Sequence, residues 1–195
     1  AFRYHGGTDH SALLKKQVSL SDGVTLNVWV EKTEDSEAKV SAALVAQLAS
    51  AFGQAGGIYD LLKETGGPLW STHTYQDLVS STAPIDIVIM NFHPDGQPFG
   101  EMGYFHAINN FRKTVLANSN ESVSLYLDAE TLYLGGAKGV QAIKGTMAHE
   151  GLHMSNFFRR GIMMGSDYQY DLWLEEMVAM MMEDATGSAV DPTYN

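Results

Sequence analysis

The segment HEGLH, from His149 to His153, constrains this chain more than any other feature of its sequence. It lies in a stretch with the length and apolar spacing of a helix, and residues four apart on a helix point in the same direction. Both imidazoles can therefore reach one ion. Glu150 is rotated by about 100° from His149, so its carboxylate lies at the edge of that face rather than on the ion. The segment predicts a helix with a metal-binding face.

The HExxH pattern has a defined chemistry when the metal is zinc. Two neutral imidazoles bind the ion, and the glutamate takes a proton from a zinc-bound water that attacks a carbonyl group. The chain has no cysteine, so any metal must be held by His, Asp or Glu side chains. His149 and His153 are therefore the expected zinc ligands, and Glu150 is the expected catalytic general base and acid.

A catalytic zinc site takes three protein ligands and leaves one position open, so a third ligand must come from elsewhere. The pattern HExxHxxGxxH would supply a histidine, but Asn156 and Arg159 stand where it needs glycine and histidine. The stretch WLEE, Trp173 to Glu176, offers two adjacent glutamates at the start of the last expected helix. They point about 100° apart, so only one can bind, and periodicity does not choose between them. Asp167 is the alternative ligand for an aspartate-type site.

HEGLH followed by WLEE resembles the gluzincin clan of zinc peptidases, in which HExxH is followed by a glutamate that is often in a WLxE context. Within that clan, HEGLHMSNFF is similar to the hyicolysin-type bacterial peptidases. The resemblance assigns the third zinc ligand to Glu176 and leaves Glu175 as its neighbour. Gly151 and Leu152 depart from the aromatic residue and the glutamine usual at these positions, which leaves the metal ligands unchanged.

The resemblance also implies a fold and an activity. The fold is an α+β zincin-like domain, in which an N-terminal mixed sheet with helices precedes the active-site helix and the glutamate helix. The activity is that of a secreted bacterial zinc endopeptidase, and Tyr168 or Tyr170 would stabilise the oxyanion. An extended peptide or protein substrate would lie antiparallel to an edge strand, for which GEMGYFHAI, residues 100–108, is the candidate. Because few residues follow Glu176, we expect a C-terminal subdomain that is short or absent, or a chain that is a fragment.

The pattern of apolar residues predicts the elements of this domain. Residues 1–22 are expected to form an N-terminal tail or linker, and residues 23–195 the catalytic domain. The last helix is apolar almost all the way round, so we expect it to be buried. The expected strands are 23–32, 84–92, 100–108 and 122–134, the last one broken near Asp128, and the expected helices are 36–52, 58–64, 139–160 with a C-cap at Gly161, and 172–187.

Charge and composition limit the partners. The formal net charge of −11 repels phosphate backbones and anionic lipid surfaces, so we expect neither nucleic acid nor a membrane as partner. No apolar run approaches the roughly 18 residues of a membrane-spanning helix. The alternative to an enzyme is a non-catalytic zinc-binding module, in which a structural zinc holds two helices together.

Overall fold

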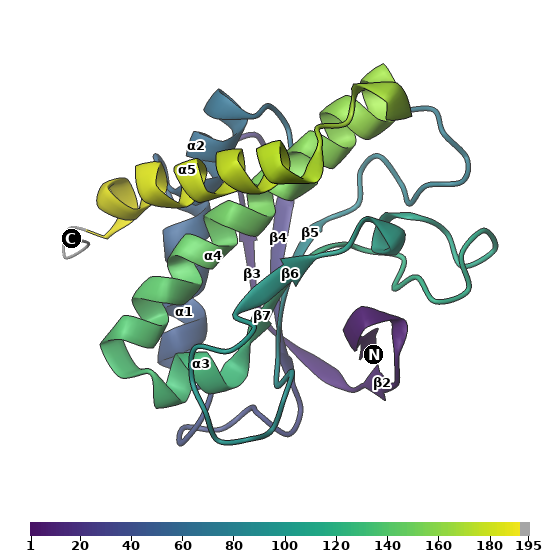
Figure 1. The fold of residues 1–195 in the computed structure, drawn as a ribbon. Helices are drawn as coiled ribbons and strands as arrows, with labels where there is room; N and C mark the ends of the chain where they lie inside the picture. Colours follow the sequence, from purple (N-terminus) through teal and green to yellow (C-terminus); the bar gives the residue numbers. More distant parts are fainter. Residues whose placement is uncertain (192–195) are drawn as a thin grey trace.

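The computed structural model describes residues 1–191 and is built around a five-stranded mixed sheet (Figure 1). β4, β5 and β7 run parallel, while the outer strands β3 and β6 are antiparallel to their neighbours β4 and β7. The expected mixed sheet and α+β class are confirmed. Across the sheet, the strands lie in the order β3 (Ala12–Ser19), β4 (Thr25–Glu31), β5 (Ile85–Met90), β7 (Val123–Asp128) and β6 (Gly103–Phe105).

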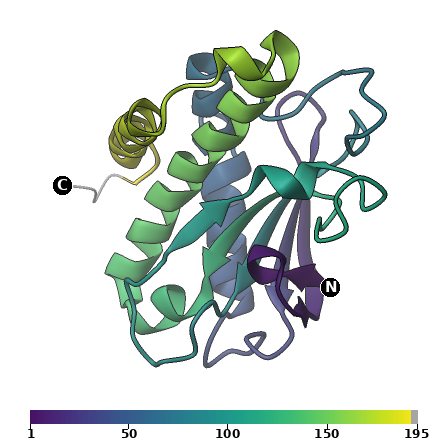
Figure 2. The ribbon, with the colours of Figure 1, turned by 45° about the vertical axis from the view of Figure 1, so that its right-hand side comes forward.

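The longer helices cover one face of this sheet. Figure 2 shows α1 and α4 against that face, α5 on the outside of α4, and the N-terminal segment on the opposite face. A π-helical segment, Phe157–Met164, continues directly from α4. The helices are α1 (Ala42–Gly53), α2 (Ile58–Thr65), α3 (Ala129–Leu134), α4 (Gly136–Asn156) and α5 (Leu172–Val190). Within residues 1–191, no helix combines the length and apolar character needed to cross a bilayer.

β5 illustrates how the sequence specifies the centre of the sheet. All of its residues are buried, as expected for a parallel strand that is covered on both faces. Ile85, Ile87 and Ile89 belong to the main core below the helices. Val88 and Met90 point the other way, into a smaller core that the N-terminal segment covers. The predicted central strand in residues 84–92 is therefore confirmed.

Residues 1–22 are not a tail or linker over most of their length, and this prediction was wrong. Residues 12–19 form the edge strand β3, paired with β4, and two short strands, β1 (Phe2–Arg3) and β2 (Asp9–His10), pair with each other. Phe2 is buried in the smaller core. Polar and charged residues such as Lys15 and Lys16 are typical of an edge strand, but they also resemble a linker in sequence.

Two expected element boundaries also differ. The break predicted near Asp128 in residues 122–134 is confirmed, but the residues after it form helix α3 rather than strand, because the Asp128 carboxylate accepts a hydrogen bond from the Thr131 N–H at 2.7 Å and caps that helix. The helix expected at residues 139–160 starts earlier, at Gly136, and does not end at Gly161. It passes into the π-helical segment, and the backbone turns at Gly165, where φ is 112°.

Helix α5 was expected to be buried all round, and this is also wrong. Its inner face packs on α4 through Ala179 and Met182, and these side chains are buried. Its outer face is exposed. The reason is that the apolar pattern shows which faces of a helix are apolar, but not which of these faces pack against another element. The large apolar residues exposed on this helix are Leu172, Trp173, Met177, Met180 and Met181.

The edge strand β6 approaches α4 closely at Gly103. A Cβ atom there would lie 2.5 Å from the Thr146 Cγ2 and 2.8 Å from the Tyr126 carbonyl oxygen. Gly103→Ala should therefore lower the free energy of unfolding by about 1–3 kcal/mol, because an added methyl group has no room. Gly100→Ala is the matched control, since a Cβ at Gly100 would meet nothing within 4 Å. Urea denaturation of both variants measures the difference, and equal stabilities would contradict this close packing.

Candidate active site

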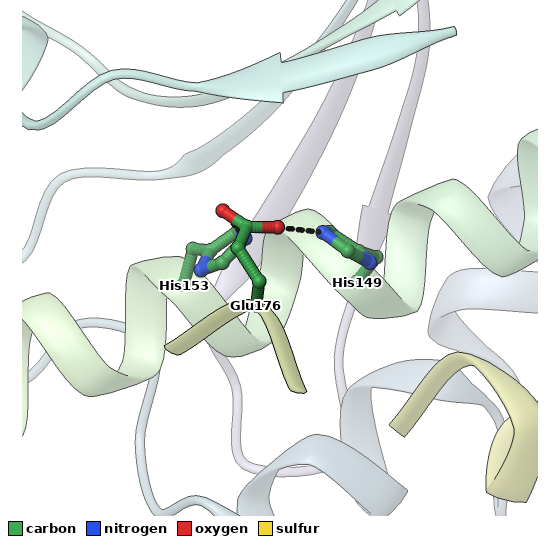
Figure 3. A group of neighbouring side chains, drawn as sticks. All are labelled: His149, His153 and Glu176. Atoms are coloured by element: carbon green, nitrogen blue, oxygen red, sulfur yellow. Dashed lines mark ion pairs between the residues drawn. The ribbon is translucent and has the colours of Figure 1, made fainter. Parts of the chain in front are cut away.

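The structure brings His149, His153 and Glu176 together at the contact between α4 and α5 (Figure 3). Both histidines lie on α4, and Glu176 lies near the start of α5. The Glu176 carboxylate oxygens are 3.4 Å from the His149 Nε2 and 3.7 Å from the His153 Nε2. Among residues 1–191, this is the only group of three or more His, Asp or Glu side chains with one ligand atom each within 4.8 Å of the others.

The donor set and its spacing fit zinc. Two imidazole nitrogens and one carboxylate oxygen are the ligands of many catalytic zinc sites, and they leave a fourth position open. Zinc–ligand bonds of about 2.0–2.1 Å at tetrahedral angles separate the donor atoms by roughly 3.3–3.5 Å. The distances from Glu176 to the two histidines are close to this separation.

Glu175, the other candidate glutamate in the sequence, contacts His153 at the ring nitrogen that Glu176 does not approach. Its Oε1 lies 3.0 Å from the His153 Nδ1 and also accepts a hydrogen bond of 3.0 Å from the Asn156 side-chain amide. A carboxylate at Nδ1 favours the tautomer with its proton there, which leaves Nε2 free to bind a metal. The two adjacent glutamates therefore have different positions: Glu176 at Nε2 and Glu175 at Nδ1.

Glu183 stands in the equivalent position at the other histidine, and sequence reasoning missed it. Its Oε2 lies 3.5 Å from the His149 Nδ1, and this contact is the main reason that the pKa of His149 is raised. Gly145 makes room for it, because a Cβ there would lie 2.8 Å from the Glu183 Oε1. The available signal was spacing, since Glu183 follows Glu176 by about two helical turns and so shares its face.

Glu150 is buried beside the two histidines, under the edge strand. One of its carboxylate oxygens, Oε2, accepts a hydrogen bond of 2.8 Å from the Phe105 backbone N–H on β6. Burial raises the pKa of Glu150, and it outweighs the opposing effects of His153, His149 and the Phe105 N–H, which lower it. The result is a carboxylate held rigidly by one oxygen, with a pKa shifted towards neutrality.

The remaining predicted residues lie in the connection to α5. Tyr170 lines a cavity of about 310 Å³ next to His153 and Glu176, and the Arg160 guanidinium lies 3.7 Å from the centre of its ring. Tyr168 lies outside the lining of this cavity and is half exposed, and its carbonyl oxygen accepts a hydrogen bond from the Arg160 Nε. Asp167, the alternative ligand, is exposed and is not in the metal-binding group.

An HExxH helix below the antiparallel edge strand of a mixed sheet, with a glutamate supplied by a later helix, defines a zinc metallopeptidase of zincin type. The profile of the family described as Peptidase M30 matches residues 6–195. The chain therefore belongs to this family, the hyicolysin family of zinc metallopeptidases, which act on peptides or proteins. The resemblance seen in the sequence and the zinc cofactor are confirmed. No curated protein matches the chain significantly.

The geometry ranks the acidic residues by their effect on zinc affinity. Loss of a residue that hydrogen-bonds a metal ligand typically weakens metal binding by roughly 10- to 100-fold. Glu176→Ala should weaken zinc binding by more than this, and Glu175→Ala should weaken it within this range. Asp167→Ala, which removes an exposed carboxylate outside the group, should leave the affinity unchanged. Competition with a chromophoric chelator measures all three. A larger loss in Asp167→Ala than in Glu176→Ala would contradict the ligand set.

A substitution at Gly145 separates helix stability from metal binding. Alanine at a helical glycine favours the helix by about 1 kcal/mol, but here it displaces Glu183 from His149. Gly145→Ala should therefore lower zinc affinity by up to the roughly 10- to 100-fold expected for Glu183→Gln. The thermal stability of the metal-free protein should fall little. Calorimetric titration with zinc measures the affinity, and an unchanged affinity in both variants would show that Glu183 does not support His149.

Proposed function

We propose that the chain is a zinc-dependent endopeptidase in which Glu150 acts first as general base and then as general acid. The observation that carries this proposal is the buried Glu150 carboxylate, which lies next to both ligand histidines and is anchored by the Phe105 N–H. A site that only held zinc for structural purposes would not need it. Burying an ionisable group costs free energy, and enzymes commonly accept this cost to tune a catalytic pKa.

His149, His153 and Glu176 would hold the metal, and Glu175 and Glu183 would orient the two imidazoles. Zinc at this position would act as a Lewis acid that activates water and polarises the scissile carbonyl. Glu150 would use Oε1 to take the proton of the attacking water, because Oε2 is engaged by Phe105. The raised pKa makes Glu150 a stronger base for this first step, and the proton that it takes up would then pass to the leaving amine.

Tyr170 is the better of the two tyrosines for stabilising the oxyanion. Tyr170 lines the cavity beside His153 and Glu176, whereas Tyr168 is not among its lining residues and is half exposed. A phenolic hydroxyl group directed at the developing negative charge would strengthen as a hydrogen-bond donor in the transition state. We therefore propose Tyr170 for this role.

The substrate would be an extended segment of a peptide or protein chain bound along β6. β6 pairs with β7 on one side only, so its other side can receive a further strand. Binding along an edge strand needs no chain terminus, and this favours endopeptidase activity. Secretion, which the family resemblance implies, is part of the same proposal.

Glu150→Gln tests the proposal against the non-catalytic alternative. The amide keeps the size of the side chain but cannot take a proton, so casein hydrolysis should fall by about 10²- to 10⁴-fold or more. Zinc content should remain near that of the unsubstituted protein, as measured by atomic absorption. If both proteins bind zinc and hydrolyse casein equally fast, Glu150 is not the base. If neither hydrolyses any peptide, the site is structural.

A further inference from the structure

The cavity of about 310 Å³ lies at one end of the site, beyond His153. Its lining includes His153, Asn156 and Phe157, which follow one another along α4 and into the π-helical segment. On the side of β6, the cavity is bounded by Phe105, the last residue of that strand, and by Ala107 just after it. The volume is at the lower end of the range for ligand pockets, which run from roughly 300 to 1,000 Å³. Because the cavity adjoins a metal ligand, a substrate group inside it would lie next to the scissile bond.

β6 and α4 run in the same direction past the site. Gly103, at the start of β6, packs on Thr146, and Phe105, at its end, donates to Glu150. The cavity therefore lies at the C-terminal end of both elements. This direction matters because it determines which side of the scissile bond faces the cavity.

The hydrogen-bond pattern of β6 leaves two of its residues facing the cleft. The Met102 carbonyl oxygen accepts a hydrogen bond from the Asp128 N–H at 2.9 Å, and bonded pairs alternate along antiparallel strands. Tyr104, opposite Tyr126, therefore bonds to β7, and Gly103 and Phe105 direct their backbone groups away from it. The Phe105 N–H already donates to Glu150, so a peptide at this edge would pair with the remaining backbone groups of these two residues. A peptide added antiparallel at this edge runs from Phe105 towards Gly103. Its N-terminal half then lies over the cavity.

The residues that line the cavity determine which kind of substrate side chain it can bind. Phe105, Phe157 and the ring of Tyr170 present aromatic surface, and Ala107 and Leu172 add apolar surface. A basic side chain would meet the Arg160 guanidinium, which is stacked on Tyr170. An acidic side chain would lie near the carboxylates of Glu175 and Glu176. A charged side chain of either sign would therefore meet a like charge as well as an opposite one, whereas a large neutral ring gains contacts with the surrounding aromatic groups and meets no like charge.

We propose that this cavity binds the substrate side chain immediately N-terminal to the scissile bond, and that it selects a large apolar side chain, aromatic above all. The proposal rests on the peptidase function proposed above and specifies its substrate. Phe157 and Leu172 are the residues that determine this specificity, because both line the cavity with apolar surface. Phe157 also packs against Phe105, with 5.9 Å between the ring centres, so the two rings form a continuous aromatic wall.

The first experiment uses the zinc-loaded protein and a set of synthetic peptides that differ at one position. Phe, Leu, Ala, Asp and Lys are placed in turn at that position, and mass spectrometry identifies the bond that is cut. Cleavage should leave Phe or Leu as the new C-terminus, with kcat/KM about tenfold or more above that of the Ala peptide. Phe consistently at the new N-terminus would overturn the assigned side. A preference for Asp that is lost in Arg160→Gln would overturn the assigned chemistry.

The second experiment compares variants by the ratio of kcat/KM for the Phe peptide to that for the Ala peptide. Phe157→Ala should lower this ratio about tenfold or more. Phe111→Ala is the matched control, because Phe111 packs against Phe157 at a ring distance of 6.4 Å but is not a lining residue, and its ratio should stay unchanged. Leu172→Ala guards against a folding defect, since Leu172 is 76% exposed and its loss should still lower the ratio.

These outcomes separate the two proposals. Hydrolysis that depends on Glu150 but shows an unchanged ratio in Phe157→Ala and Leu172→Ala contradicts the specificity pocket and leaves the peptidase intact. Absence of hydrolysis of every peptide and of casein contradicts the peptidase itself.

Discussion

The contact between the histidine face of α4 and the acidic face of α5 is the interaction on which the rest of the site depends. Three carboxylates of α5 meet two imidazoles of α4: Glu176 lies between the Nε2 atoms, and Glu175 and Glu183 lie at the Nδ1 atoms. Without a metal, the contacts with the histidine nitrogens partly compensate the negative charge of the carboxylates. We propose that with zinc bound the same arrangement would supply one ligand, Glu176, and two partners that would hold the imidazoles in the binding tautomer.

The elements around this contact can approach it closely only because of two glycines. α5 can place Glu183 against α4 only because residue 145 is glycine, and β6 can place the Phe105 N–H on Glu150 only because residue 103 is glycine. The segment from Gly161 to Val190 contains no Lys, Arg or His, while the whole chain has a formal net charge of −11. The helix that completes the metal site is thus a source of negative potential, which favours binding of a metal cation.

The sequence predicted which side chains come together as a metal-binding group, but not the residues that support them. The HEGLH spacing pointed to His149 and His153, and the resemblance chose Glu176, because these positions depend on local helical geometry and a recurring pattern. The catalytic role of Glu150 stays a prediction. Glu183 was not predicted, since its role depends on how two helices cross. β3 was taken for a linker because an exposed edge strand lacks apolar alternation, and α5 was expected to be buried because periodicity carries no information on partners. The π-helical turn after Asn156 had no sequence signal that we could identify.

The most direct test of this account is a crystal structure of the zinc-loaded protein with anomalous data collected at the zinc absorption edge. We expect one zinc ion per chain, about 2.0–2.1 Å from the Nε2 atoms of His149 and His153 and about 2.0–2.2 Å from a Glu176 carboxylate oxygen. Glu175 and Glu183 should remain at the Nδ1 atoms. Zinc bound through Nδ1, or held by Glu175 or Glu183 in place of Glu176, would contradict it.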